Sequence, residues 1–438
     1  MGHLAALKEE YRRLVKRLGA GTVGLPEPEE ESARRGWQEV LEILYTPADA
    51  ALASRLPVLP APLEAIARRV GLDAVELRGR LESMADKGLV LDLPDPKGGA
   101  TLYLLAPPVV GFFEFSMMRA RDSVPKRRLA EAMDAYFRGD ETFAREVFGH
   151  ETQIGRALVH ETALDPEPPE VLDFERAEAV IRDSRIAAVS LCYCRHKAEH
   201  LGERCGAPME NCLSLDEGAE FIARRGFGRR IETSEALELL AASRERQLVQ
   251  IADNVQSRPA WICNCCACCC CQLRPVNRLG LRAVAPSGFL PACDPARCSG
   301  CGRCARACPA GAVTLEPRRL ERQARGTLVP RLDAERCLGC GVCADVCGRE
   351  ALSMGRAAAG PRVPASSIEK ALRMALERGR LPDLLFDAGA GLGSRALNRL
   401  LRALCALPPV ERALASEQVR SRLVRRVLAG LPVSDRGR

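Results

Sequence analysis

The cysteines of this chain are numerous and regularly spaced, as metal-binding cysteines often are. The chain has 21 cysteines, and 20 of them lie between Cys192 and Cys347. Two runs, starting at Cys298 and at Cys337, share the spacing Cys-x2-Cys-x2-Cys-x3-Cys. Clustered thiols in a reducing cytosol are more typical of metal ligands than of disulfide bonds. A cubane iron–sulfur cluster needs one thiolate at each iron corner, and a tight loop with this spacing can wrap three of them.

The fourth cysteine of each run is expected to begin a helix that points away, and so to reach the neighbouring cluster. Four glycines in the loops would let backbone N–H groups approach the sulfides: Gly300, Gly302, Gly339 and Gly341. The sequence therefore predicts two [4Fe–4S] clusters with exchanged ligands. The ligands of the first would be Cys298, Cys301, Cys304 and Cys347. The ligands of the second would be Cys337, Cys340, Cys343 and Cys308.

The paired motif is similar to that of the bacterial two-cluster ferredoxin family, and the resemblance covers residues 286–355. It implies a ferredoxin-like domain that passes electrons between two clusters. A pair of zinc sites from the same cysteines is the alternative, but a zinc site needs no third closely spaced cysteine of this kind.

Two further cysteine groups precede this motif. The first is Cys192-x-Cys194-x10-Cys205-x6-Cys212, and the second is the run ICNCCACCCC that starts at Ile262. Three interpretations stay open: a third iron–sulfur cluster sharing ligands between the groups, a structural zinc ion at the first group, or reactive thiols without a stable metal. The candidate ligands of this third site are Cys192, Cys194, Cys205, Cys212, Cys263, Cys265, Cys266 and Cys268.

Positive side chains surround the first of these groups. Arg195, His196, Lys197 and His200 lie beside Cys194 in the sequence, and such cations would lower thiolate pKa values and raise a cluster's potential. The layout also resembles uncharacterised bacterial 4Fe–4S dicluster domain-containing proteins with an N-terminal helical domain and the C-Y-C-R and I-C-N-C-C segments. That resemblance adds architecture and no mechanism.

The elements that must position these cysteines follow from the hydrophobic pattern. Residues 37–105 read as helices followed by two apolar strands, Leu89–Leu93 and Thr101–Leu105, an order that resembles a winged-helix domain. Such a domain binds DNA or docks proteins. Residues 35–97 hold eight Lys/Arg and ten Asp/Glu, which does not favour DNA because phosphates attract positive surfaces.

The fold class expected is α+β with several domains, mainly helical in its N-terminal and middle regions. The predicted divisions are an N-terminal helix and linker at 1–34, a winged-helix-like domain at 35–110, a helical cysteine-rich domain at 111–285, the ferredoxin-like domain at 286–355 and a basic helical tail at 356–438. From Arg356 to Arg438 there are sixteen Lys/Arg and seven Asp/Glu, a net +9, so the rest sums to 7 − 9 = −2.

The sequence predicts a cytoplasmic protein, because no apolar run approaches the roughly 20 residues that span a bilayer and the N-terminus lacks a signal peptide's apolar stretch. The expected function is electron transfer through two [4Fe–4S] clusters, to or within a redox enzyme complex, with a redox protein as partner. Two alternatives stay open: a redox- or iron-responsive winged-helix regulator, and a reductase with an extra cluster. The sequence identifies no catalytic residue or substrate.

Overall fold

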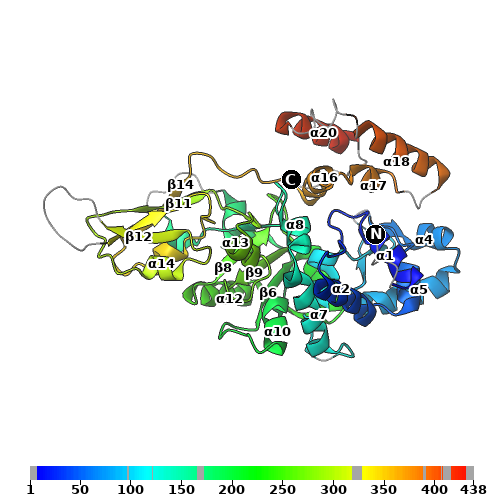
Figure 1. Ribbon diagram of the computed structural model, residues 1–438, viewed down its shortest axis with the longest axis horizontal. Helices are drawn as coiled ribbons and strands as arrows, with labels where there is room; N and C mark the ends of the chain where they lie inside the picture. The colour runs from blue at the N-terminus through cyan, green and yellow to red at the C-terminus, as the bar shows by residue number, and fades with distance from the viewer. Residues whose placement is uncertain are drawn as a thin grey trace. The chain divides into compact units, whose positions relative to one another are not determined.

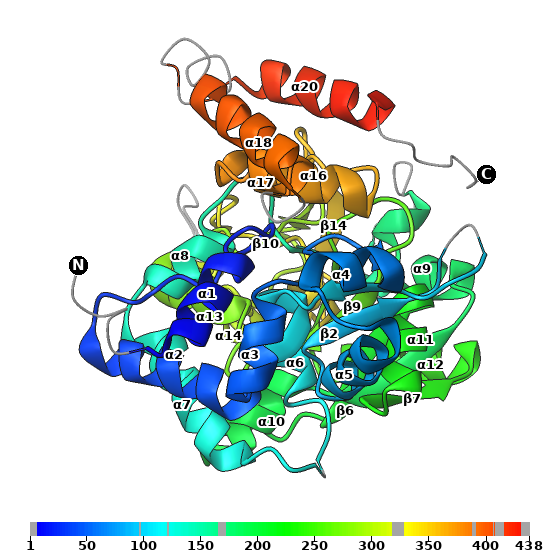
Figure 2. The same ribbon diagram turned by 90° about the vertical axis from the view of Figure 1, so that its right-hand side faces the viewer.

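The computed structural model describes residues 7–95, 98–120, 122–164, 172–317, 328–387, 391–405, 407 and 416–430. The chain forms two compact units (Figures 1 and 2). One contains the described residues of Met1–Ser116, Glu131–Thr152 and Pro364–Arg438, and the other those of Met117–Ala130 and Gln153–Val363. Each unit combines helices with sheet, which confirms the α+β class.

The first unit contains three short strands and most of the helices outside the cysteine-rich region. Its elements before the tail are α1 (Glu9–Leu18), α2 (Glu31–Leu44), α3 (Pro47–Ala53), β1 (Ala61–Pro62), α4 (Leu63–Val70), α5 (Ala74–Asp86), β2 (Val90–Leu93), β3 (Leu102–Leu105), η1 (Pro108–Phe112), α6 (Phe113–Phe115) and α8 (Thr142–Phe148). Helix α7 (Lys126–Gly139) begins in the second unit and ends in the first. The predicted boundary at residue 34 falls inside α2.

The predicted hairpin is present, with β2 and β3 paired antiparallel and β1 on the outer side of β3. Helix α5 begins after Asp73, whose side chain accepts hydrogen bonds from the backbone N–H groups of Val75 and Glu76. The assignment of this region to the winged-helix class stays a prediction.

The tail is helical, as predicted, and Figure 2 shows its helices lying together. They are α16 (Ser367–Glu377), α17 (Leu381–Leu385), α18 (Leu392–Cys405) and α20 (Glu417–Gly430). Leu372, Leu381 and Val424 are buried in their shared apolar core. Several tail arginines are engaged in ion pairs, among them Arg378 and Arg380, which both pair with Glu146.

The second unit is built on a seven-stranded sheet of order β10-β4-β8-β9-β6-β5-β7, antiparallel except for the β10–β4 pair. The strands are β4 (Gly155–Ala157), β5 (Ala187–Leu191), β6 (Glu210–Leu215), β7 (Gly228–Ile231), β8 (Val249–Asp253), β9 (Trp261–Cys265) and β10 (Val284–Ala285). The helices around them are η2 (Glu161–Ala163), η3 (Asp173–Glu175), α9 (Ala177–Asp183), α10 (Tyr193–His200), α11 (Asp216–Arg224), α12 (Thr233–Glu245) and α13 (Leu273–Leu279).

The prediction of a mainly helical middle region at 111–285 omitted this sheet, although helices hold more of the region's described residues than strands do. Its strands are three to six residues long, apart from the two-residue β10, and β5 and β8 are buried along nearly their whole length. A strand covered on both faces shows a short apolar run instead of alternation, and such a run is hard to tell from a segment of buried helix. The helices α9 and α12 pack on one sheet face through a core that includes Ile181, Val189 and Leu240.

The ferredoxin-like segment follows the sheet within the same unit (Figure 1). It has two antiparallel pairs, β11 (Phe289–Cys293) with β14 (Leu352–Arg356) and β12 (Val313–Pro317) with β13 (Leu328–Leu332). Two short helices, α14 (Arg303–Ala307) and α15 (Val342–Asp345), complete it. The predicted boundary between residues 355 and 356 falls inside β14.

Candidate metal centres

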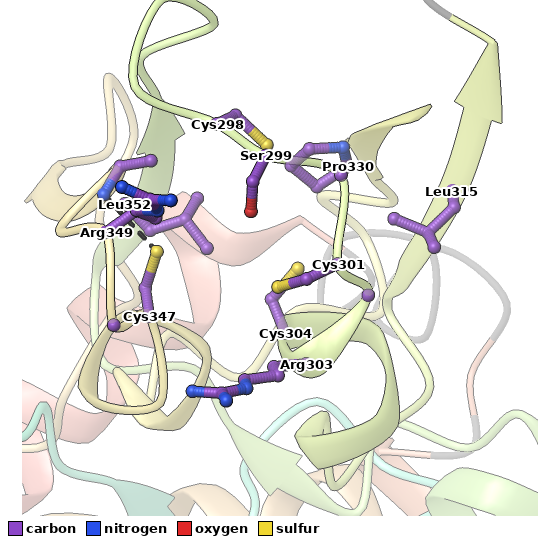
Figure 3. A pocket seen from close by; sticks show the side chains of 14 residues that line it. Cys298, Ser299, Cys301, Arg303, Cys304, Leu315, Pro330, Cys347, Arg349 and Leu352 are labelled. Carbon is purple, nitrogen blue, oxygen red and sulfur yellow. Dashed lines mark hydrogen bonds between the residues drawn. The ribbon is translucent and has the colours of Figure 1, made fainter. Parts of the chain in front are cut away.

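Three cysteines of the first run and the last cysteine of the second surround one cavity of about 270 Å³ (Figure 3). They are Cys298, Cys301, Cys304 and Cys347. Their sulfurs point into a common space, which Leu315 and Leu352 border on its sides. Cys301 is exposed, so this cavity opens at the protein surface. The exposed arginines Arg303 and Arg349 also line it.

The other four cysteines of the motif surround a second, smaller cavity. They are Cys308, Cys337, Cys340 and Cys343. Apolar residues such as Leu338 and Met354 complete its lining. Cys340 and Cys343 are each only 8% exposed, so this cavity lies deeper than the first. The fold thus groups the eight cysteines as three from one run and one from the other.

Glycines shape the loops that carry these cysteines. Gly300, Gly302, Gly339 and Gly341 all have positive φ, a conformation that other residues adopt at a cost. A Cβ on Gly339 would overlap the Phe289 carbonyl oxygen and the Ser287 hydroxyl, and a Cβ on Gly300 would overlap the backbone of Leu328. Alanine would fit neither position without movement of the backbone.

The fourth cysteine of each run does not begin a helix, contrary to the sequence expectation. Cys308 follows the end of α14, and Cys347 comes two residues after α15. Each helix begins after a left-handed glycine and includes the third cysteine of its run. Pro309 explains the stop after α14, because the residue before a proline is disfavoured in the helical conformation.

Backbone N–H groups point at several of these sulfurs. The amides of Ala312, Gly339 and Ala351 donate to the sulfurs of Cys308, Cys337 and Cys347 at 3.2, 3.4 and 3.3 Å. Such donors stabilise negative charge on sulfur and are one of the factors that set a cluster's potential.

The donor set fits an iron–sulfur cluster, because each cavity offers four free thiols. Burial raises the pKa of Cys337 to about 11 and that of Cys343 to about 12, and it raises the pKa of Cys340 further. Thiols in this environment stay protonated without a metal. Loading must therefore displace their protons, as metal binding to cysteine requires.

The loop around the second cavity is fixed to the sheet by His160, which is fully buried. The His160 backbone N–H donates to the Cys340 carbonyl at 3.0 Å. Its ring nitrogens lie 2.6 Å from an Asp345 carboxylate oxygen and 3.1 Å from the Leu248 carbonyl. Both neighbours are acceptors, so a ring with a hydrogen on each nitrogen satisfies both. Sequence reasoning did not find this histidine, because nothing near it in the chain marks it.

The thiols on strands β6 and β9 lie on the opposite face of the sheet from α9 and α12. Leu213 of β6 and Ile262 of β9 point into the apolar core. Because side chains alternate along a strand, Cys212, Cys263 and Cys265 point to the other face. Cys212 and Cys263 are direct partners across the two strands, with their sulfurs 4.0 Å apart.

Four thiols from both cysteine groups gather in one place, with every pair of sulfurs within 4.8 Å. They are Cys205, Cys266, Cys268 and Cys269. Cys205 comes from the loop after α10, and the other three come from the turn after β9. Three of the eight predicted ligands are in this quartet, and Cys269 is a member that the prediction omitted.

The other five predicted ligands, with Cys270 and Cys271, form a second group of thiols. Cys194 lies within hydrogen-bonding reach of Cys192, Cys270 and Cys271, and Cys265 lies within reach of Cys263 and Cys270. The hydrogen bonds from Cys212 and Cys265 lower the pKa of Cys263 to about 5. The eight predicted residues thus divide between two neighbouring thiol groups.

The predicted cations near Cys194 differ in their burial and in the groups they contact. Arg195 and Lys197 are buried, at 0% and 2% exposed. A hydrogen bond with Cys269 lowers the pKa of Cys266 to about 5, and the Arg195 guanidinium adds to this effect. The Nε2 atoms of His196 and His200 lie 3.2 Å apart, and the Nδ1 atom of His196 lies 2.6 Å from the Met117 carbonyl oxygen.

Comparison with known proteins agrees with the geometry of the motif. Residues 297–351 match the family model described as the 4Fe-4S dicluster domain. No curated protein and no solved structure matches the chain. No helix in the part of the chain that the structure describes has the length and hydrophobicity to cross a membrane. The matched segment and its two thiol-lined cavities make this chain an iron–sulfur protein with a 4Fe–4S ferredoxin-like segment.

Proposed function

We propose that residues 286–355 hold two [4Fe–4S] clusters with exchanged ligands and pass electrons between them. The observation that carries the proposal is the grouping of eight cysteines around two cavities, each with three from one run and one from the other. The first cluster is held by Cys298, Cys301, Cys304 and Cys347. The second is held by Cys337, Cys340, Cys343 and Cys308. A bound cluster accepts and releases one electron, and the chain supplies thiolates, amide donors and a partly apolar enclosure.

The two sites differ in exposure, so the exposed cluster exchanges electrons with an outside partner and the deeper cluster exchanges them with the interior of the protein. The cavity with exposed Cys301 is where an external redox protein exchanges electrons. The exposed Arg303 and Arg349 at this cavity favour an acidic partner, because complementary charge speeds encounter.

The deeper cluster connects with the cysteine-rich part of the same unit. Asn277 of α13 donates to the carbonyl of Pro309, the residue after Cys308, at 2.9 Å. Helix α13 begins two residues after Cys271, and Asn277 lies four residues into that helix, a rise of about 6 Å. The middle region is therefore a further redox station or the exit toward a partner enzyme.

The region of α2 to β3 serves in protein docking in this proposal. Two cations of the α5 region already have acidic partners, since Lys87 pairs with Asp49 at 2.8 Å and Arg80 with Glu76 at 3.9 Å. Such pairing leaves little positive charge for a phosphate backbone. If the region serves in docking, the protein should bind immobilised DNA at low salt no more strongly than it binds an uncharged matrix.

The test of the main proposal is metal analysis and spectroscopy of protein prepared without oxygen. We expect the Cys298–Cys347 motif to contribute about eight iron ions and as many sulfide ions per chain, the content of two [4Fe–4S] clusters. Full reduction should give the paramagnetic signature of two magnetically interacting clusters. Iron and sulfide sufficient for a single cluster, or zinc alone, would overturn the proposal.

A further inference from the structure

The quartet Cys205, Cys266, Cys268 and Cys269 differs in spacing from the ferredoxin cysteines. Its four sulfurs all lie within 4.8 Å of one another, and two pairs, Cys205–Cys266 and Cys268–Cys269, are 3.7 Å apart. Among the residues that the structure describes, the cysteines of the ferredoxin-like segment form no group this tight. They surround open cavities instead.

This spacing distinguishes a single metal ion from a cubane. Four thiolates at about 2.3 Å from one tetrahedral zinc ion have sulfurs about 3.8 Å apart. Thiolates on a cubane are bonded to separate irons, and their sulfurs are therefore farther apart. The 3.7 Å pairs match the edge of a mononuclear tetrahedron.

Two arginines hold the loops of the quartet together. Arg274 donates from Nε to the Cys268 carbonyl at 2.9 Å, and from its terminal nitrogen to Glu203, two residues before Cys205, at 3.2 Å. Arg195 donates to the carbonyls of Pro208 and Asn264 at 3.0 and 2.7 Å. Both side chains thus join the loop of Cys205 to the segment around Cys266.

The buried charge of Arg195 is a second, independent observation that favours a negatively charged group beside it. Its side chain is 0% exposed, and its Nε has no hydrogen-bond partner among the described oxygen and nitrogen atoms. Three sulfurs act on its charge, those of Cys192, Cys266 and Cys265, and of these Cys266 belongs to the quartet. A buried cation without a counter-charge is strongly unfavourable. A divalent ion with four thiolates carries a net charge of about −2 and supplies that counter-charge.

We propose that Cys205, Cys266, Cys268 and Cys269 bind one divalent ion of the zinc type in a closed tetrahedral site, separate from the iron–sulfur clusters. The site joins the α10–β6 loop to the β9–α13 turn and stabilises the thiol-bearing side of the sheet. It does not depend on the proposed electron transfer, and it stands even if the motif holds a different number of clusters.

The test compares single-cysteine variants of the full chain, purified without oxygen. Zinc, iron and sulfide are measured for the parent and for two variants, Cys269→Ser and Cys205→Ser. Cys205 lies in a loop, so its replacement is less of a risk to folding than replacement of the buried Cys269. Cys212→Ser, a neighbouring thiol outside the quartet, is the matched control. Far-ultraviolet circular dichroism verifies that each variant is folded.

We expect the parent to hold about one zinc ion that both quartet variants lose and Cys212→Ser keeps, with iron and sulfide of the ferredoxin-like segment unchanged. X-ray absorption at the zinc edge should show a single shell of sulfur and no neighbouring metal. Loss of one iron without sulfide would support the same mononuclear site with iron as its ion. Loss of iron together with equal sulfide would mean a cluster, and would overturn the proposal, as would zinc that both quartet variants retain.

Discussion

Replacement of Gly339 by alanine should damage the second of the two proposed clusters more than any other small change to its loops. Gly339 has φ of 67°, and a Cβ there would come within 3.0 Å of the Phe289 carbonyl oxygen and the Ser287 hydroxyl. The Ser287 hydroxyl also donates to the Gly339 carbonyl at 2.6 Å, so a shift of the loop breaks that bond. Gly339 lies between two proposed ligands, Cys337 and Cys340.

The magnitude follows from three separate costs. The left-handed conformation costs an alanine about 1–2 kcal/mol. Overpacking against a fixed neighbour costs about 1–3 kcal/mol. Loss of the buried Ser287 hydrogen bond costs about 1 kcal/mol. The loop should thus be destabilised by roughly 3–6 kcal/mol. Each 1.4 kcal/mol is a tenfold change in the population of an opened loop, so the population rises by roughly a hundredfold or more.

The assay is iron release to an excess of chelator under anaerobic conditions, followed by the visible absorbance of the cluster. Gly339→Ala should release about half of the motif's iron at least roughly a hundredfold faster than the parent. Two controls separate the causes. Gly311→Ala, with φ of 61° and its nearest neighbour at 3.7 Å, carries the conformational cost alone and should accelerate release roughly tenfold. Gly355→Ala, in open space, should change nothing. Equal release rates for Gly339→Ala and Gly355→Ala would refute the reasoning.

Three further predictions concern the ligands, the support of the second cavity and the partner. Cys308→Ser should change the paramagnetic signal of the deeper cluster and Cys347→Ser that of the exposed one; the reverse assignment would show that the ligands are not exchanged. Asp345→Asn replaces a charge-assisted hydrogen bond to His160 by a neutral one of about half the strength. It should lower the free energy of unfolding by about 1–1.5 kcal/mol in denaturant titrations, so an unchanged midpoint would contradict it. Arg399→Glu, on the exposed side of α18, should slow electron exchange with an acidic partner most at low ionic strength, whereas equal rates at every salt concentration would exclude the tail from docking.

The metal-binding character of the ferredoxin-like segment could be predicted from its residues alone. The spacing of the two cysteine runs is a local property, because a loop of seven residues that wraps three thiols needs no distant part of the chain. The Asp73 cap of α5 and the β2–β3 hairpin were likewise predictable, since a cap and a hairpin depend on neighbours within a few residues.

The grouping of the other cysteines could not be predicted, because it depends on contacts between distant parts of the folded chain. Cys205 and Cys266 are 61 residues apart, and strand pairing across β6 and β9 brings their loops to the same place. Cys269 and Cys270 are adjacent in the run after β9 and have similar neighbours in the sequence. Cys269 nevertheless joins the quartet, whereas Cys270 joins the second group. No periodicity marks that difference, because it depends on the direction in which each side chain leaves a tight turn. The seven-stranded sheet that sets this direction could not be predicted either, because strands buried on both faces lack the alternation of polar and apolar residues that identifies a strand.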